Sequence, residues 1–238
     1  MRSPDADSKG QTLDKASAAS HCVSMSTVLT FGDSNTHGTP PIANLDTLGI
    51  CDRYPKGTRW PTVMAAALGK EWDLVEDGLP GRTAQFDDPV MDGVMNGYPA
   101  LRQALQSHGP LDVLTIMLGT NDTKARFSAT PRRIAEGITR LLDLATGPEM
   151  QTRHAGFKVL LIAPSSVIEV GVLASEFIGA NARSTALTPL LRAAAISKGA
   201  AFLDAGDVVS SSQIDGVHLT ASAHKSLGLA VARVIRGF

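Results

Sequence analysis

The sequence lacks the features on which several classes of protein depend. Its two cysteines, Cys22 and Cys51, are too few for a disulfide framework and lack the spacing of a metal site. The formal net charge is −1, so no basic field favours nucleic acid. No apolar run approaches the roughly 18 residues of a membrane span. We therefore expect no metal, cofactor, nucleic acid or membrane partner. We expect Cys22 and Cys51 to be free thiols in a reducing compartment.

The length and composition of the chain fit a single α/β domain. The chain has 238 residues, 43% of them hydrophobic, which is enough for a complete core. Residues 1–26 are rich in Ser, Asp, Lys and Ala and lack the continuous apolar segment of a signal peptide. We therefore predict a disordered extension over 1–26, a single domain over 27–238 and, by default, a cytoplasmic location.

Short apolar runs alternate with segments of helical periodicity along this domain. The predicted strands are 27–31, 73–77, 111–118, 158–163 and 201–204. The predicted helices are 60–68, 98–106, 131–144, 181–198 (which Pro189 should interrupt) and a last helix capped by Thr220. This alternation predicts right-handed βαβ crossovers, and therefore a three-layer sandwich around a mostly parallel five-stranded sheet.

The first predicted strand ends in Gly32-Asp33-Ser34. Turn and helix-start residues after a buried strand predict a sharp strand-to-helix turn, which exposes the Ser34 hydroxyl at the carboxyl edge of the sheet. The backbone N–H groups of such a helix start can face an anion. Ser34 is therefore a candidate nucleophile.

Asp215 and His218 are separated by two residues near the C-terminus. His218 is suited to take the proton of Ser34 and to return it to a leaving alkoxide. Asp215 can accept a hydrogen bond from the other ring nitrogen and stabilise the imidazolium. Gly216, between them, allows the turn to fold tightly.

Two further turns each follow a predicted strand and carry Gly81 and Asn121. The carboxyl ends of parallel strands meet at one edge of a sheet, where ligands bind in open α/β folds. The N–H groups of Ser34 and Gly81 and the side-chain amide of Asn121 are therefore predicted to form an oxyanion hole for a tetrahedral intermediate.

The four segments 31–34, 78–83, 119–122 and 215–218 together resemble the blocks of the SGNH (GDSL-type) hydrolases, and within them the arylesterase/acyltransferase branch. The resemblance implies a flavodoxin-like SGNH hydrolase fold, with Asp215 completing a catalytic triad. It covers nearly all of 27–238. His37 departs from the branch, whose members usually carry Trp there, and Pro80-Gly81 replaces a less rigid pair in some relatives.

The resemblance also implies an activity. It predicts a serine esterase that cleaves short-chain, acetyl-type esters through an acyl-serine intermediate, with water or an alcohol as acceptor. It also implies a possible homo-oligomer, with loops 40–56 and 165–179 as walls of the entrance. Alternatives on the same scaffold are a carbohydrate acetyl esterase and a lysophospholipase/thioesterase. From other classes, an acyl- or sugar-binding module would not need all five groups, and a nucleotide-binding protein would need a glycine-rich loop that is absent.

Other polar and apolar residues receive lesser roles. The candidates for contact with substrate are Leu79, Phe127, Val170 and His37. Asp33 and Asp122 are expected to hold their turns through bonds to backbone N–H groups. His224 is expected to pack between helices or lie on the surface. Arg82 and Lys124 are expected either to attract an anionic substrate or, more commonly, to form salt bridges.

Overall fold

The computed structural model describes residues 25–47 and 53–238. Five parallel strands form one sheet in the order β2-β1-β3-β4-β5. Their bounds are β1 (Ser26–Gly32), β2 (Trp72–Gly78), β3 (Val113–Met117), β4 (Lys158–Ala163) and β5 (Ala201–Asp204). This is the flavodoxin-like strand order, which confirms the predicted sheet. Cys22, Cys51 and nearly all of the predicted N-terminal extension lie outside the described residues.

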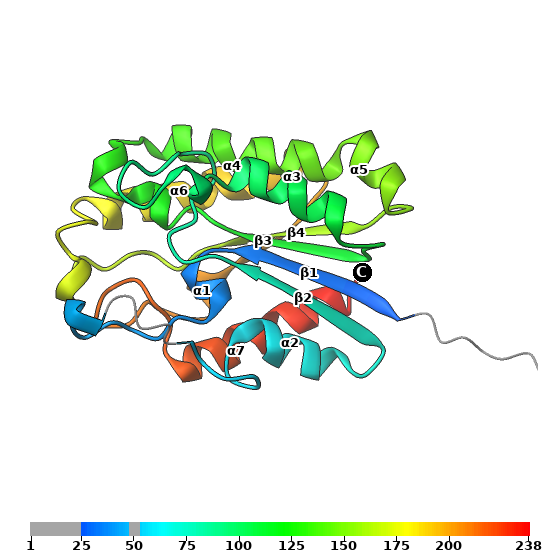
Figure 1. The fold of residues 1–238 in the computed structure, drawn as a ribbon, viewed down its shortest axis with the longest axis horizontal. Helices are drawn as coiled ribbons and strands as arrows, with labels where there is room; N and C mark the ends of the chain where they lie inside the picture. The colour runs from blue at the N-terminus through cyan, green and yellow to red at the C-terminus, as the bar shows by residue number, and fades with distance from the viewer. Residues whose placement is uncertain (1–24, 48–52) are drawn as a thin grey trace, which may run out of the picture.

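Helices cover both faces of the sheet (Figure 1). One face carries α3 (Gly97–Ser107), α4 (Pro131–Thr146), α5 (Pro148–Arg153) and α6 (Ala180–Ser197); the other carries α2 (Trp60–Leu68) and α7 (Ala221–Ile235). Alternate side chains of β1 point toward the two helical layers, because successive side chains of a strand lie on opposite faces of the sheet. Leu29 and Phe31 join the core under α3, α4 and α6, whereas Val28 joins the core under α2 and α7. The predicted three-layer architecture is confirmed.

One helix differs from the prediction: α6 runs from Ala180 to Ser197 without a break at Pro189. Pro189 is exposed, while Leu187 and Leu191 on either side of it are buried in the core. Burial of these neighbours outweighs the one backbone hydrogen bond that proline cannot make. The short helix α5 begins at Pro148 and was not predicted.

The register of the strands brings three turns together at the carboxyl edge of the sheet. Gly32, the last residue of β1, pairs with Gly78 on one side and with Met117 on the other. The strands β1, β2 and β3 therefore end at the same level of the sheet. These ends lie beside the short helix α1 (Ser34–His37), which follows β1 (Figure 1). No helix in the described ranges is long and apolar enough to cross a bilayer.

The second helical layer depends on close contact between α2 and α7. A Cβ atom placed on Gly228 of α7 would lie 2.7 Å from the carbonyl oxygen of Trp60 and 2.8 Å from the Cβ of Val63. A backbone oxygen cannot move aside as a flexible side chain can. Glycine at this position therefore sets the distance between the two helices.

We expect Gly228→Ala to destabilise the protein by about 1–3 kcal/mol, because the added methyl group overpacks this contact. In a domain of this size, that loss lowers the melting temperature by roughly 2–12 °C. Thermal unfolding followed by circular dichroism measures it. Ser226→Ala, an exposed change on the same helix, is the control. Equal melting temperatures for both variants and the unmodified protein would contradict this role of Gly228.

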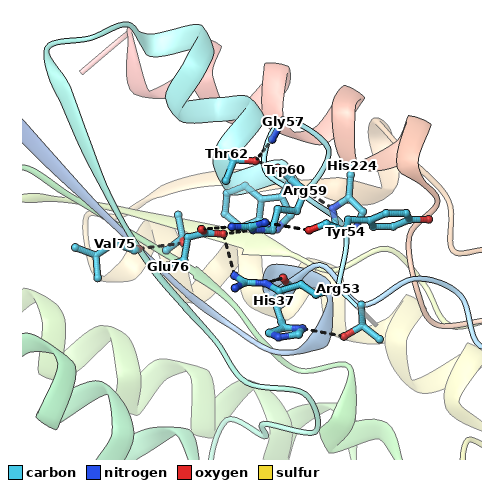
Figure 2. A network of polar contacts seen from close by, with 12 residues as sticks. His37, Arg53, Tyr54, Gly57, Arg59, Trp60, Thr62, Val75, Glu76 and His224 are labelled. Atoms are coloured by element: carbon cyan, nitrogen blue, oxygen red, sulfur yellow. Dashed lines mark hydrogen bonds and ion pairs between the residues drawn. The ribbon is translucent and has the colours of Figure 1, made fainter. Parts of the chain in front are cut away.

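His224 also joins these two helices. It is fully buried, its Nδ1 accepts a hydrogen bond of 3.2 Å from the backbone N–H of Trp60, and its ring meets that of Tyr54 edge to face (Figure 2). Burial, together with the charge of His218, lowers the pKa of His224 to about 4. His224 is therefore neutral near pH 7, and the prediction of a helix-packing histidine is confirmed.

This pKa makes stability depend on pH with a definite sign. The unfolded chain binds a proton at His224 below its ordinary value of 6.5, whereas the folded protein does so only near 4. Acidification between these values therefore favours unfolding, by about 2 kcal/mol from pH 7 to pH 5. The variant His224→Asn offers an acceptor to Trp60 but does not titrate. Between pH 7 and pH 5, we expect its free energy of unfolding, measured by urea denaturation, to fall by about 2 kcal/mol less than that of the unmodified protein. Parallel losses in both proteins would refute this assignment.

Candidate functional site

The nucleophile turn is built from the end of β1 and the first residues of α1. The Asp33 side chain caps α1 by accepting a hydrogen bond of 2.9 Å from the N–H of Asn35. Ser34 follows as the first residue of the helix, with 6% of its surface exposed. The Oγ of Ser34 lies 3.0 Å from Nε2 of His218. The predicted strand-to-helix turn therefore presents the hydroxyl to the predicted base.

Asp215 holds the other side of the His218 ring. Its Oδ2 lies 2.6 Å from Nδ1 of His218, and the same oxygen accepts a bond of 2.7 Å from the N–H of Ile42. Burial would raise the pKa of Asp215, but the hydrogen bond and charge of His218, with the N–H groups of Ile42 and Val217, lower it to about 2. The carboxylate is thus ionised and only accepts, so Nδ1 carries the proton and Nε2 is left to face Ser34.

The glycine turn, residues 79–82, lies beside the nucleophile turn. Its Pro-Gly centre, the φ of +89° at Gly81 and the bond of 3.0 Å from the N–H of Arg82 to the oxygen of Leu79 are typical of a type II turn. This hydrogen bond uses the amide of Arg82 and leaves that of Gly81 for another acceptor. A bond of 3.1 Å from the N–H of Leu79 to the oxygen of Gly32 ties the turn to the end of β1.

Asn121 lies in the turn after β3. It is buried, and its Nδ2 donates a hydrogen bond of 3.1 Å to the backbone oxygen of Arg82. One of its two amide hydrogens is thereby engaged, and the second remains for a ligand. The next residue adds a second link, because both carboxyl oxygens of Asp122 accept from the N–H of Ala84, at 3.0 and 2.9 Å. The turn after β3 is therefore bonded at two points, to the glycine turn at Arg82 and to the chain just after it at Ala84.

Asp33 and Asp122 are buried next to Ser34 and Asn121. Burial raises the pKa of Asp33 to about 6, although the N–H of Asn35 and the charges of His218 and Arg82 oppose the rise. Burial raises the pKa of Asp122 to about 7, and the charge of Asp33 adds to the effect. Their bonds to backbone N–H groups confirm that both residues hold turns, as predicted.

The two basic residues of this region form ion pairs. Arg82 lies 2.8 Å from the carboxylate of Asp77, donates to two backbone oxygens and stacks over the ring of Phe31. Lys124 lies 3.5 Å from Glu176. Both cations are buried, at 5% exposure each. The salt-bridge alternative is thus confirmed for both.

A second ionic cluster supports the chain that leaves the nucleophile turn (Figure 2). Glu76 of β2 accepts two bonds from Arg59, at 2.5 and 2.6 Å, and one of 3.1 Å from Arg53. Arg53 also donates to the backbone oxygen of His37 at 2.7 Å. Burial and these two guanidinium charges lower the pKa of His37, so its imidazole is neutral near pH 7. The cluster fixes the end of α1 against the sheet.

The predicted substrate-contact residues occupy different surroundings. Val170 lies against the turn of Asp215, since its backbone nitrogen is 3.3 Å from where a Cβ on Gly216 would sit. Leu79 begins the glycine turn, and His37 ends α1. Phe127 instead stacks on Phe86, with ring centres 5.0 Å apart, at the edge of the core under α4. Contact with substrate stays a prediction for all four.

Two residues beside the site had no signal in the sequence. The Cε and Sδ of Met91 lie 2.5 and 2.8 Å from where a Cβ on Gly81 would sit, so this half-exposed side chain covers the glycine. Ile42 supplies a backbone donor to Asp215 from the long loop after α1. Neither residue type nor spacing marks these contacts, because they depend on how loops lie in space. Within the described part of the chain, no group of three His, Cys, Asp or Glu side chains is placed to hold a metal.

The loop at 165–179 packs against the same site. Val167, Leu173, Phe177 and Ala180 form a small third core with Val217, the residue before His218. The predicted wall segment therefore packs against the side chain of Val217, next to the predicted base.

Solved structures of similar proteins share this architecture. Est24, a carbohydrate acetylesterase from Sinorhizobium meliloti, is 37% identical with a TM-score of 0.82, over 89% of this chain and 99% of that one. The native aryl esterase of M. smegmatis is 34% identical with a TM-score of 0.82, over 89% and 99%. A putative arylesterase from Agrobacterium tumefaciens str. C58 is 36% identical with a TM-score of 0.79, over 90% and 99%. No curated protein matches the chain.

Residues 30–225 match the GDSL-like Lipase/Acylhydrolase family. That segment contains all four of the sequence blocks described above, together with every strand after the first residues of β1. The chain therefore belongs to the GDSL-like lipase/acylhydrolase family, which confirms the predicted resemblance and the prediction of a carboxylic ester hydrolase.

Proposed function

We propose that this protein hydrolyses short-chain, acetyl-type carboxylic esters, with Ser34 as nucleophile. The observation that carries the proposal is the continuous chain of hydrogen bonds from Asp215 through His218 to Ser34, at 2.6 and 3.0 Å. This is the arrangement by which a base and an orienting carboxylate activate a serine hydroxyl. The similarity to a carbohydrate acetylesterase supports a small acyl group, and the similarity to an aryl esterase supports an ester substrate.

The geometry suits a two-step reaction. As the Ser34 Oγ attacks the ester carbonyl, Nε2 of His218 takes its proton, and the ionised Asp215 stabilises the resulting imidazolium. The carbonyl oxygen becomes an oxyanion, which accepts hydrogen bonds from the N–H groups of Ser34 and Gly81 and from the amide of Asn121. The tetrahedral intermediate then collapses, His218 gives the proton to the leaving alkoxide, and Ser34 remains acylated.

The second step reverses the roles. Water gives a proton to His218 and attacks the acyl carbon, and Ser34 recovers its proton when acid is released. An alcohol in place of water would yield a new ester, so transfer to alcohols belongs to the same proposal. A cytoplasmic location and assembly into a homo-oligomer stay predictions.

A second candidate substrate class is acetylated carbohydrate. The similarity to Est24, a carbohydrate acetylesterase, favours it over the lysophospholipase/thioesterase alternative. Rates on an aryl acetate and on a fully acetylated monosaccharide would compare the two classes directly.

We expect Ser34→Ala to lower acetate release from a chromogenic aryl acetate by at least about 10⁴-fold, because the covalent route is lost. Ser226→Ala, an exposed change on α7, should retain the full rate. Mass spectrometry should find the acyl adduct on the peptide that contains Ser34. Equal rates for the Ser34 variant and the unmodified enzyme would exclude this serine as the nucleophile.

We expect Asn121→Ala to lower kcat by about 10²–10³ and to change KM little, because its amide hydrogen is required when the oxyanion forms. Steady-state kinetics on the same aryl acetate separates the two constants. A rise in KM at unchanged kcat would mean that Asn121 binds substrate rather than the transition state.

A further inference from the structure

We propose that Asn35 is a positioning residue that holds His218 at hydrogen-bonding distance from Ser34. The inference rests on the proposed function and extends it to a residue outside the triad and the oxyanion hole. Asn35 directly follows Ser34 in α1, and only 4% of its surface is exposed.

The amide of Asn35 uses both of its polar groups on the backbone around His218. Its Nδ2 donates a hydrogen bond of 3.1 Å to the oxygen of Val217. Its Oδ1 accepts one of 3.0 Å from the N–H of Leu219. The two bonded residues stand immediately before and after His218. The side chain thus pairs with this segment as a neighbouring strand would, and fixes both its distance and its rotation.

The other bonds of the histidine segment act differently. Asp215 bonds to the ring of His218, to backbone N–H groups of its own turn and to Ile42. The backbone oxygen of His218 accepts from the N–H of Ser212 in the same loop. These contacts orient the ring and shape the loop. The bonds of Asn35 join that loop to the nucleophile turn itself.

Asn35 is in turn held from its own side. The cap bond from its N–H to Asp33 Oδ1, at 2.9 Å, fixes the backbone from which the side chain extends. A path of three hydrogen bonds therefore runs from the cap of α1 to both neighbours of His218. Because the reacting atoms must be placed within a fraction of an ångström, loss of such a link can cost up to about 100-fold in rate.

The chemistry of the contact requires an amide. Val217 offers an acceptor and Leu219 a donor, so the bridging group must donate at one end and accept at the other. Alanine supplies neither group. Aspartate retains the acceptor for Leu219 but, when ionised, has no hydrogen to donate to Val217. Asn35→Ala therefore removes both hydrogen bonds, whereas Asn35→Asp removes only the bond to Val217.

The test compares Asn35→Ala and Asn35→Asp with a matched control, Gln151→Ala. Gln151 of α5 also bridges two backbone positions with its amide, donating to Ala145 at 2.9 Å and accepting from Phe157 at 3.1 Å. It lies in α5, at the other end of the sheet from α1 (Figure 1). The readouts are kcat and KM on an aryl acetate, the melting temperature, and the rate at which a nitrophenyl phosphonate labels Ser34.

We expect Asn35→Ala to lower kcat by about 10–100-fold with KM changed less than about 2-fold, and to slow labelling in proportion, because both reactions need His218 beside Ser34. Asn35→Asp should fall between this variant and the unmodified enzyme. Gln151→Ala should lose thermal stability but retain kcat within about 2-fold.

The inference is overturned if the Asn35 variants that fold retain kcat and labelling rate within about 2-fold, or if Gln151→Ala loses as much activity at the same loss of stability. Should Asn35→Ala fail to fold, Asn35→Asp decides between these outcomes. If Ser34→Ala also retains full activity, the proposed function fails as well. If Ser34→Ala is inactive and the Asn35 variants are not, only the role of Asn35 is refuted.

Discussion

The structure depends on the register in which β1 pairs with β2 and β3. Because Gly32 stands opposite both Gly78 and Met117, the nucleophile, glycine and asparagine turns begin at one level of the sheet. The same register decides which side chains of β1 enter each core. A slip by one residue would reverse the two faces of the strand and move Ser34 away from Gly81 and Asn121. Packing of the two helical layers and assembly of the site thus depend on the two ladders of backbone hydrogen bonds that β1 forms with β2 and β3.

Beyond the carboxyl ends of the strands, hydrogen bonds from side chains hold the turns in place. Asp33 caps α1, Asn121 bonds to Arg82, and Asp122 bonds to Ala84. This arrangement has an energetic cost, since the raised pKa values of the two carboxyl groups mean that ionising them in the folded protein is unfavourable. Their contribution to stability is largest below the ordinary pKa of 3.8 and is lost as pH rises from there to about 6 for Asp33 and about 7 for Asp122. The protein thus gives up stability for a rigid site.

The sequence was sufficient where the determinants are local. The runs that form β4 and β5 predict their bounds without error, and the Asp215–His218 spacing predicts a bond within one turn. It was insufficient where a role depends on a distant partner. Asn35 follows Ser34 in the chain, but its partners lie more than 180 residues away. Pro189 predicts a break that burial on either side prevents. The periodicity of the sequence carries no information about the partners of Asn35 or about the burial around Pro189.

The bond between Ser34 and His218 spans 184 residues and joins the turn after the first strand to the loop before the last helix. In the proposed mechanism, a chain still being synthesised therefore carries its nucleophile long before its base. Until that last loop leaves the ribosome and docks on the completed sheet, the serine is an ordinary hydroxyl with no partner to activate it. Under the proposed mechanism, this topology predicts that esterase activity appears only when the two ends of the fold have met.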